Sequence, residues 1–293
     1  EDGETATISG MTIENDGQRG LEGDEAILTL DDVVFDGLGN ASSYGGAAYI
    51  DEGSLTATDV TFSSNTAYAG GALYATDGVA LTLERVSLSG NSAIYGGALY
   101  LSDSGADVSL DLTDCTLSSN EASSSGGGVY AADEAALTGS GTTWEDNVST
   151  NGQGGALYLS DEVTYTSDGA TWDGNTAEAG RGGALYAYTD SVVTITDGEF
   201  VDNAAAYGAH AYSYYGEITV GTTDFSGGVA TSTAGALYAN AATAVLSDVT
   251  FSSNTAGSSG GAIYAYYEAT LAVSSATFTA NTAGNSGGDI GAY

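Results

Sequence analysis

Acidic side chains recur at nearly regular intervals along the 293-residue chain. The aspartates that share this spacing are Asp51, Asp77, Asp103, Asp133, Asp161 and Asp190. If they stack on successive turns of a repeat, two unit charges about 4.8 Å apart repel by roughly 0.9 kcal/mol even in water, so the column attracts cations. Ca²⁺ prefers carboxylate and carbonyl oxygens, which makes these aspartates candidate calcium ligands. No D-x-[DN]-x-[DN]-G loop occurs, and solvated carboxylates in a salty or calcium-rich medium are the alternative.

Tyrosines recur with the same interval, close to the acidic positions. They are Tyr49, Tyr74, Tyr100, Tyr130, Tyr158, Tyr186, Tyr212, Tyr238 and Tyr264. Their neighbours Leu and Ala suit a narrow interior, whereas every buried tyrosine hydroxyl would need a partner, so we expect the rings outside. An exposed stripe of this length is typical of a contact surface for another surface protein or a glycan. Rings that only stack on one another and protect the strand are the alternative.

The charge balance is extreme, with 39 Asp and Glu residues against three basic residues. A surface this negative repels phosphate backbones and anionic lipids, so we expect no nucleic-acid partner. The apolar runs fall short of the roughly 18 to 20 residues that cross a bilayer, so we expect no membrane insertion. The chain begins at Glu1, which fits a secreted protein whose signal peptide has been removed, or an excised fragment. We expect an extracellular or cell-surface location.

The elements that position these columns follow from an internal repeat. An F-x-x-N slot recurs every 25 to 29 residues. Its aromatic or leucine positions are Phe35, Phe62, Leu88, Leu117, Trp144, Trp172, Phe200, Phe225, Phe251 and Phe278. Asparagine stands three residues later at Asn65, Asn91, Asn120, Asn147, Asn175, Asn203, Asn254 and Asn281. A period in this range is typical of a solenoid, in which one repeat cannot bury its apolar face until another stacks on it.

Within each repeat the apolar residues alternate with polar ones, as in strands. We predict three short strands per coil, in an all-β, single-stranded parallel β-helix of about ten to eleven coils. Residues 1–293 then form a single domain with uncapped ends. Glycine pairs mark the corners, where positive φ is needed.

Single positions have simpler interpretations. The aromatic slot is expected in the core, and the asparagines form a ladder that bonds backbone groups at a corner. Cys115 occupies a core slot, so it is interpreted as an inert buried thiol, and a lone cysteine excludes an internal disulfide. His210 falls on the same strand face as the tyrosines and is interpreted as an incidental surface residue.

The chain resembles the chlamydial polymorphic membrane proteins and related surface passenger domains, which repeat G-G-A-[ILV] and F-x-x-N. The G-G-A-[ILV] matches are residues 70–73, 96–99, 154–157, 182–185 and 260–263. The resemblance implies a right-handed β-helix displayed outside the cell, with adhesion as the usual role. A C-terminal membrane barrel is missing from this sequence, and Lys and Pro are absent, so the resemblance does not extend to the mode of export.

The two chain ends are similar in phase to adjoining parts of one coil. Ile8, Met11 and Ile13 match successive core slots, and the chain stops at Ile290 and Tyr293 within a G-G-x-x-Y strand. Counted from Tyr293, a second molecule placed head to tail reaches the core slot at Ala6 after five residues, close to the usual interval. Such a contact does not close on itself and generates a filament.

Three functions follow from this reading. The first is a structural subunit of a head-to-tail surface filament or matrix fibre, with itself as partner. The alternative is a monomeric adhesin whose tyrosine-rich face binds a partner. The third is a polysaccharide-cleaving β-helix enzyme, which we do not favour because the three arginines are dispersed and no long insertions build a cleft. No cofactor is required, and Ca²⁺ is the one considered.

Overall fold

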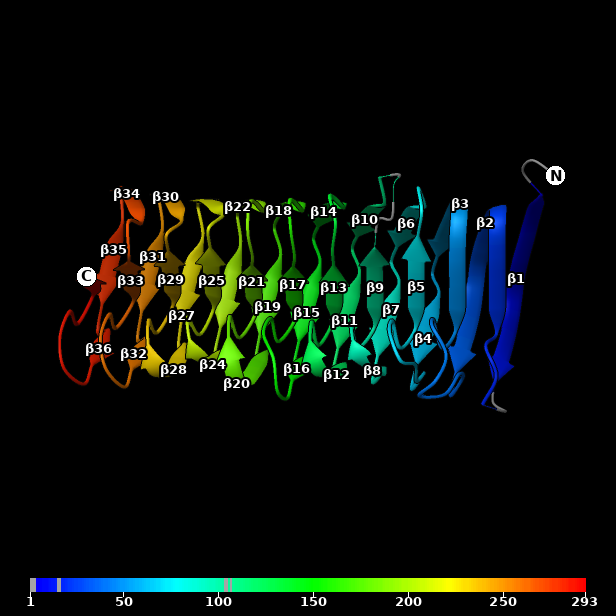
Figure 1. The fold of residues 1–293 in the computed structure, drawn as a ribbon, viewed down its shortest axis with the longest axis horizontal. Helices are drawn as coiled ribbons and strands as arrows, with labels where there is room; N and C mark the ends of the chain where they lie inside the picture. Colours follow the sequence, from blue (N-terminus) through cyan, green and yellow to red (C-terminus); the bar gives the residue numbers. More distant parts are fainter. Residues whose placement is uncertain (1–3, 15–16, 103–104, 106) are drawn as a thin grey trace.

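The computed structural model describes residues 4–14, 17–102, 105 and 107–293, and its described elements are all β-strands. The strands stack in a regular succession along one long axis, from the N-terminal to the C-terminal end (Figure 1). All pairings are parallel and join one coil to the next, for example Leu110 to Leu137 and Leu137 to Tyr165. The predicted parallel β-helix is therefore confirmed, with about ten turns.

Four strand columns run along the solenoid. The column that carries the tyrosines, here the tyrosine strands, comprises the first part of β3 (Ala48–Thr58), then β5 (Leu73–Thr76), β9 (Leu99–Ser102), β13 (Val129–Ala131), β17 (Leu157–Leu159), β21 (Leu185–Ala187), β25 (Ala211–Tyr214), β29 (Leu237–Asn240), β33 (Ile263–Tyr266) and β37 (Ile290–Ala292). The second strands follow the turn after each tyrosine strand and are β6 (Ala80–Glu84), β10 (Ser109–Thr113), β14 (Ala136–Ser140), β18 (Thr164–Asp168), β22 (Val192–Thr196), β26 (Glu217–Gly221), β30 (Thr243–Ser247) and β34 (Thr270–Ser274).

The aromatic slots lie on the third strands. These are β4 (Thr61–Ser63), β7 (Ser87–Ser89), β11 (Thr116–Ser118), β15 (Thr143–Glu145), β19 (Thr171–Asp173), β23 (Glu199–Val201), β27 (Asp224–Ser226), β31 (Thr250–Ser252) and β35 (Thr277–Thr279). In the N-terminal coils longer strands replace the separate pieces, namely β1 (Thr5–Glu14) and β2 (Leu21–Asp36), and the second part of β3 joins the second strands.

The structure adds a fourth strand to the three predicted ones. The fourth strands follow the asparagine corner and form a separate eight-stranded sheet. They are β8 (Ser92–Tyr95), β12 (Glu121–Ser125), β16 (Val148–Ser149), β20 (Thr176–Arg181), β24 (Ala204–Tyr207), β28 (Val229–Thr233), β32 (Thr255–Ala256) and β36 (Thr282–Ala283). Their short, Ser-, Thr- and Ala-rich sequences lack the alternation that marks the other strands, which is why they resembled a turn.

The lumen is filled by side chains stacked in register. Aromatic slots of successive coils pack face to face: Phe35 lies on Phe62 with ring centroids 5.0 Å apart, and Trp144 lies on Trp172 at 4.7 Å. Both tryptophans are fully buried. The predicted core role of the aromatic slot is confirmed, and burial of this kind supplies most of the stability of a solenoid.

The glycine pairs are required for two different reasons. The first glycine of a pair adopts positive φ, as at Gly70 (φ 62), which favours a residue without Cβ. The second is needed because neighbouring coils approach closely: a Cβ on Gly71 would lie 2.1 Å from the carbonyl oxygen of Gly97. The G-G-A motif is therefore a packing requirement of the stack.

The asparagine ladder is confirmed. Asn65 donates from Nδ2 to the Oδ1 of Asn91 at 3.0 Å and to the carbonyl oxygen of Phe35 at 3.1 Å. Asn91 makes the same pair of bonds to Asn120 and Phe62. Each buried side-chain amide thus donates one hydrogen bond to a backbone carbonyl and one to the next asparagine. These bonds offset the cost of burying a polar group.

The interpretation of His210 as a surface residue is wrong. Its ring is fully buried and bridges the ladder where Gly228 takes the asparagine slot. Nδ1 lies 3.0 Å from Asn203 Nδ2, and Nε2 lies 3.0 Å from Asn254 Oδ1. Strand alternation failed here because the chain bends through the glycine corner, which turns this position inward. A Cβ on Gly228 would lie 2.5 Å from His210 Nε2, so glycine and histidine fit each other.

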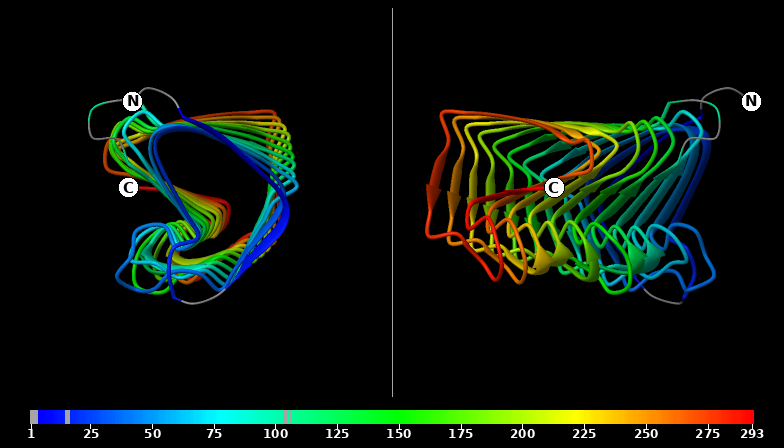
Figure 2. Two further views of the ribbon diagram at one scale, coloured as in Figure 1. Left: turned by 90° about the vertical axis from the view of Figure 1, so that its right-hand side faces the viewer. Right: turned by 60° about the vertical axis from the view of Figure 1, so that its left-hand side comes forward.

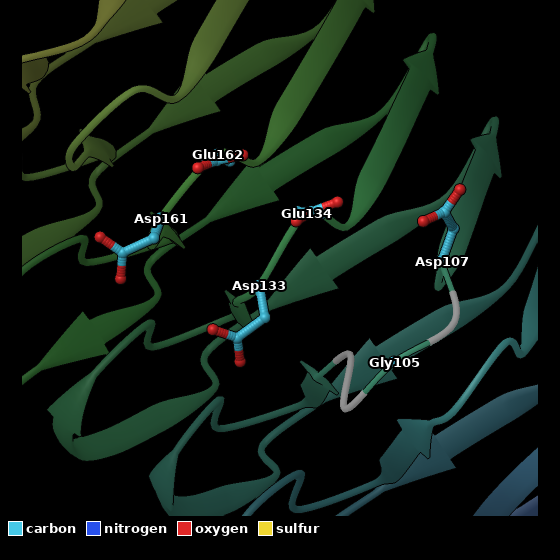
Figure 3. Close-up of a pocket in the computed structure, with 6 residues that line it drawn as sticks. All are labelled: Gly105, Asp107, Asp133, Glu134, Asp161 and Glu162. Atoms are coloured by element: carbon cyan, nitrogen blue, oxygen red, sulfur yellow. The ribbon is translucent and has the colours of Figure 1, made fainter.

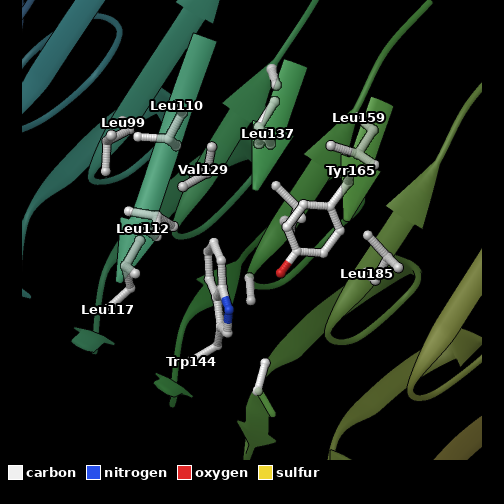
Figure 4. Close-up of a cluster of buried hydrophobic side chains, with 14 of the residues drawn as sticks. Leu99, Leu110, Leu112, Leu117, Val129, Leu137, Trp144, Leu159, Tyr165 and Leu185 are labelled. Carbon is white, nitrogen blue, oxygen red and sulfur yellow. The ribbon is translucent and has the colours of Figure 1, made fainter. Parts of the chain in front are cut away.

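One stretch of the lumen contains buried polar atoms without hydrogen-bond partners. They are Thr142 Oγ1, Trp144 Nε1, Tyr165 Oη, Ser167 Oγ and Trp172 Nε1. Figure 4 shows the Tyr165 hydroxyl and the Trp144 indole directed toward the same part of the interior. Small residues make room for these rings, since a Cβ on Gly139 would lie 3.2 Å from the Tyr165 hydroxyl.

Cys115 is buried as predicted, with 1% of its surface exposed. Burial raises the pKa of its thiol to about 11, which disfavours the reactive thiolate.

Candidate functional site

The tyrosine strands lie on the concave side of the coil. Seen along the axis, the ribbon traces a C-shaped section, and β37 crosses its inner side (Figure 2, left). The nine tyrosines named above, here the tyrosine column, stand in register from coil to coil, with Tyr100 paired to Tyr130 and Tyr130 to Tyr158. They lie outside the luminal hydrophobic cluster.

The tyrosine rings stack face to face along the column. Centroid separations are 5.1 Å for Tyr74 and Tyr100, 5.0 Å for Tyr100 and Tyr130, and 4.7 Å for Tyr130 and Tyr158. The ring planes in these pairs are 5°, 6° and 15° apart. Stacking occupies both faces of each inner ring, so the column presents ring edges and hydroxyls to its surroundings.

The expected exposed stripe is found at six of the nine tyrosines. Tyr49, Tyr74, Tyr100, Tyr130, Tyr158 and Tyr264 are partly exposed. Tyr186 and Tyr212 are 4% exposed and Tyr238 is 8% exposed, so at these three positions the expectation is wrong. Neighbouring rows of side chains, which the strand pattern did not place beside the column, cover them.

Burial determines the protonation of the column. It raises the pKa of Tyr100 and Tyr130 to about 12, and it raises the pKa of Tyr186 further. The hydroxyls therefore stay protonated at neutral pH and can donate hydrogen bonds. Tyr49 donates to Asp51 Oδ2 at 3.3 Å, and Tyr212 accepts a bond from Asn240 Nδ2 at 2.9 Å.

A row of tyrosines just before the glycine corners packs edge-on against the column. Tyr44 contacts Tyr74 with ring centroids 5.1 Å apart, and Tyr95 contacts Tyr130 at 5.6 Å. Tyr207 contacts Tyr238 at 6.1 Å. Sequence reasoning missed this row, although Tyr44 and Tyr95 stand directly before glycine pairs and Tyr207 stands directly before Gly208.

A second stacked row flanks the C-terminal part of the column. Tyr188 lies on Tyr214 with centroids 5.4 Å apart, and Tyr266 lies on Tyr293 at 5.9 Å. Tyr188, Tyr214 and Tyr266 form a cluster, separate from the lumen, with the C-terminal tyrosines of the column, namely Tyr158, Tyr186, Tyr212, Tyr238 and Tyr264. This row occupies the positions that carry Thr76, Ser102 or Ser160 in earlier coils.

Two arginines lie over tyrosine rings. The Arg19 guanidinium is 4.8 Å from the Tyr49 ring centroid. Arg181 is 5.8 Å from the Tyr207 centroid and 5.6 Å from that of Tyr212. Cation–π contacts of this kind hold a guanidinium over aromatic rings while its N–H donors stay available.

The predicted aspartate column is distributed over several shallow pockets. Asp133 and Asp161 line a pocket of about 380 Å³ together with Asp107, Glu134 and Glu162 (Figure 3). Glu134 and Glu162 were not predicted, although each directly follows a predicted aspartate.

The other predicted aspartates lie apart from that pocket. Asp77 lines a second pocket with Glu52, and Asp190 lines another with Glu217. Asp51 is partly exposed, and burial of its carboxylate raises its pKa. Asp103 lies outside the described residues. In the parts of the chain that the structure describes, no three His, Cys, Asp or Glu side chains come close enough to hold a metal ion.

The residues proposed for a head-to-tail joint occupy core slots of the outermost coils. Ile8, Met11 and Ile13 pair in register with Leu30, Val33 and Phe35, and Ile290 pairs with Ile263. Met11 is 48% exposed and Ile290 is 41% exposed. Tyr293, however, does not occupy the tyrosine slot, because Gly291 pairs with Tyr264. The tyrosine slot of the last coil lies two residues before Tyr293. Counting from Tyr293 therefore understates the interval between this slot and Ala6 of a second molecule by two residues.

The luminal stack and the coil register define a parallel β-helix, and the comparison with protein families agrees. The family described as right handed beta helix region matches residues 46–225, and the chain belongs to this family. Residues 248–266 match the Chlamydia polymorphic membrane protein repeat, so this part of the chain is similar to that repeat. Comparisons with curated proteins and with solved structures gave no match. The described residues contain no helix suited to crossing a membrane.

Proposed function

We propose that this protein is an extracellular adhesin-type domain that binds a linear polysaccharide along its tyrosine face. The tyrosine face comprises the column and the two rows beside it. The observation that carries the proposal is the column from Tyr49 to Tyr264, in which the rings from Tyr49 to Tyr238 stack on one another and Tyr264 is tilted against Tyr238. From Tyr49 to Tyr158, where the rings are partly exposed, the column offers one hydroxyl or ring edge per coil in a straight line.

The spacing of the column favours a polysaccharide over a peptide. An extended peptide rises about 3.3 Å per residue, so one lying along the axis would lose register with coils about 4.8 Å apart. A sugar unit in a linear polysaccharide is close in length to one coil. Along the partly exposed tyrosines from Tyr49 to Tyr158, each successive sugar can therefore meet an equivalent tyrosine, with ring edges and protonated hydroxyls as its contacts.

We propose binding without cleavage. Asp133, Glu134, Asp161 and Glu162 are all exposed on turn tips. The general acid of a glycosidase is instead held in a partly buried environment that raises its pKa. Release of reducing sugars from a bound polysaccharide would contradict this part of the proposal.

The test removes hydroxyls while keeping the stack. The variant Y74F/Y100F/Y130F retains all three rings, so we expect an unchanged thermal unfolding midpoint. We expect it to lose most of its retention on a panel of immobilised polysaccharides, measured by affinity electrophoresis. Tyr267→Phe is the matched control, because Tyr267 is 53% exposed and lies outside the column.

Two outcomes would contradict the proposal. One is that the wild-type protein binds no polysaccharide in the panel. The other is that the triple variant and the Tyr267→Phe control bind equally well, because the hydroxyls of the column would then make no contact.

Head-to-tail association is a second proposal. It is supported by the exposed core-slot side chains Met11 and Ile290. Further coils of the same chain would cover these side chains equally well, so the test must be direct. Negative-stain microscopy at high protein concentration should show filaments that shorten when Met11→Asp introduces a charge at this surface. Isolated short rods under all conditions would refute it.

A further inference from the structure

The three arginines of the chain differ in how their charge is balanced. Arg19 pairs with Glu22 at 2.8 Å and donates to the carbonyl oxygen of Tyr44. Arg85 pairs with Asp59 at 2.8 Å and also contacts Glu84. Within the described residues, Arg181 forms no ion pair, although the chain carries a formal net charge of −36. An uncompensated guanidinium is therefore unusual on this surface.

Arg181 lies where the tyrosine face changes character. It ends β20 and pairs in register with Tyr207 of the next coil. Its side chain is exposed, and its guanidinium lies over the rings of Tyr207 and Tyr212. These contacts hold the planar group at the edge of the column, beside the Tyr212 hydroxyl, where a ligand on the face would meet it.

The acidic turns beside the column thin out at the same place. The turns after Tyr130 and Tyr158 each carry two adjacent acids, Asp133 with Glu134 and Asp161 with Glu162. The equivalent turns after Tyr212 and Tyr238 carry Tyr215 with Gly216 and Ala241 with Ala242, and the turn after Tyr186 keeps the single acid Asp190. A negative ligand group is therefore repelled along the first part of the face and is better tolerated around Arg181.

We propose that Arg181 binds the carboxylate of an isolated acidic sugar in the polysaccharide, an inference that rests on the proposed function. A guanidinium fork binds a carboxylate by donating two parallel N–H···O bonds. The rest of the ligand along the acidic turns has to be neutral. The preferred ligand is thus a neutral backbone with sparse uronic acids, in contrast to a uniform polyanion.

The experiment compares two polysaccharides that share one backbone with a third that is uniformly acidic. Unsubstituted xylan is neutral, glucuronoxylan adds isolated glucuronic acids to the same chain, and polygalacturonate carries an acid on every sugar. We expect glucuronoxylan to bind best and polygalacturonate worst. Arg181→Gln should weaken glucuronoxylan binding about tenfold, since a charge-assisted bond is lost, while leaving xylan binding unchanged.

The controls separate charge, fork geometry and stability. Arg85→Gln makes the same change in net charge at a paired arginine and should leave all binding unchanged. Arg181→Lys keeps the charge without the fork and should give intermediate affinity. The thermal midpoint of each variant shows whether Arg181 serves only to pack against the tyrosines.

The outcomes distinguish the two proposals. Xylan and glucuronoxylan binding equally well, or Arg181→Gln leaving glucuronoxylan binding unchanged, would overturn the role of Arg181 while polysaccharide binding stands. A wild-type protein that retains no polysaccharide of the panel would overturn both.

Discussion

The tyrosine face consists of two unlike halves on one repeating scaffold. From Tyr49 to Tyr158, here the acidic half, the rings are partly exposed and lie beside turns rich in carboxylates. From Tyr186 to Tyr264, here the aromatic half, three of the four rings are buried and a second tyrosine row covers them. Arg181 lies at the boundary between the halves.

The difference shows that the backbone of the coil fixes the spacing of the side chains, whereas the residue type at each position can vary from coil to coil. Strand register places Tyr158, Tyr186 and Tyr212 in one line, with the same backbone pairing in both halves. What changes is the residue two positions later, which is Ser160 in one coil and Tyr188 in the next. Together with the loss of the paired acids from the turns, this change distinguishes the packed aromatic surface from the wet acidic one.

The halves also differ inside the lumen. Beneath the acidic half, asparagines from Asn65 to Asn175 bond one another without interruption. Beneath the aromatic half, His210 replaces one amide between Asn203 and Asn254. The ladder thus contains one titratable member.

The largest expected effect is salt dependence caused by the acidic half. Because stacked carboxylates repel and salt screens them, the thermal midpoint should rise by roughly 10 °C between low and molar NaCl. Neutralising the pocket of Figure 3 with D133N/D161N should remove about 2 to 4 °C of that rise, measured by scanning calorimetry. The matched variant E217Q/E268Q in the aromatic half should remove less.

Equal losses in both variants would show that the halves do not differ electrostatically. Calcium and magnesium at matched ionic strength extend this test. Since no three acidic side chains in the described ranges can hold a metal ion, we expect both cations to stabilise equally. A rise specific to calcium would instead establish calcium sites in the turns.

The second effect is a pH dependence that comes from the aromatic half. Burial lowers the pKa of His210 to about 4, below its ordinary value of about 6.5 in an unfolded chain. The unfolded state then takes up the proton first, so stability falls as the pH drops from about 6.5 to about 4. The full loss is about 3 kcal/mol, measured by denaturant unfolding at a series of pH values.

His210→Gln is the control, because it keeps a polar bridge to the ladder and cannot titrate. Its stability should lack the His210 component in this pH range. Asp51 and Asp173, whose pKa values burial raises, act in the opposite direction and remain in both proteins. Parallel pH profiles for wild type and His210→Gln would refute the burial of a neutral imidazole.

The smallest effect concerns the lumen near the boundary of the halves. Tyr165→Phe removes a buried hydroxyl that has no hydrogen-bond partner. We expect the free energy of unfolding to change by less than about 1 kcal/mol, since no bond is lost. A loss above about 2 kcal/mol would mean that the hydroxyl is bonded in solution, for example through a buried water.

The fold was predictable because the same sequence pattern recurs in every coil of the solenoid. Stacking one coil on the next buries the aromatic slots of the F-x-x-N motif and gives the asparagines hydrogen-bond partners. The fourth strands escaped because short stretches such as Val148–Ser149 carry no alternating pattern. The alignment of the tyrosines in one column could be predicted from the sequence. Which of these tyrosines are exposed and which are covered could not.

The sequence by itself determined the period, the buried aromatic stack and the alignment of Tyr49 through Tyr264, because these depend only on spacing along the chain. Only the tertiary structure decided that His210 joins the asparagine ladder, that Tyr212 is covered, and that Arg181 has no acidic partner among the described residues. These features depend on how each coil bends at its glycine corner and on which columns thereby meet. The bend brings together residues from different strands and coils, and their spacing along the sequence does not predict these contacts.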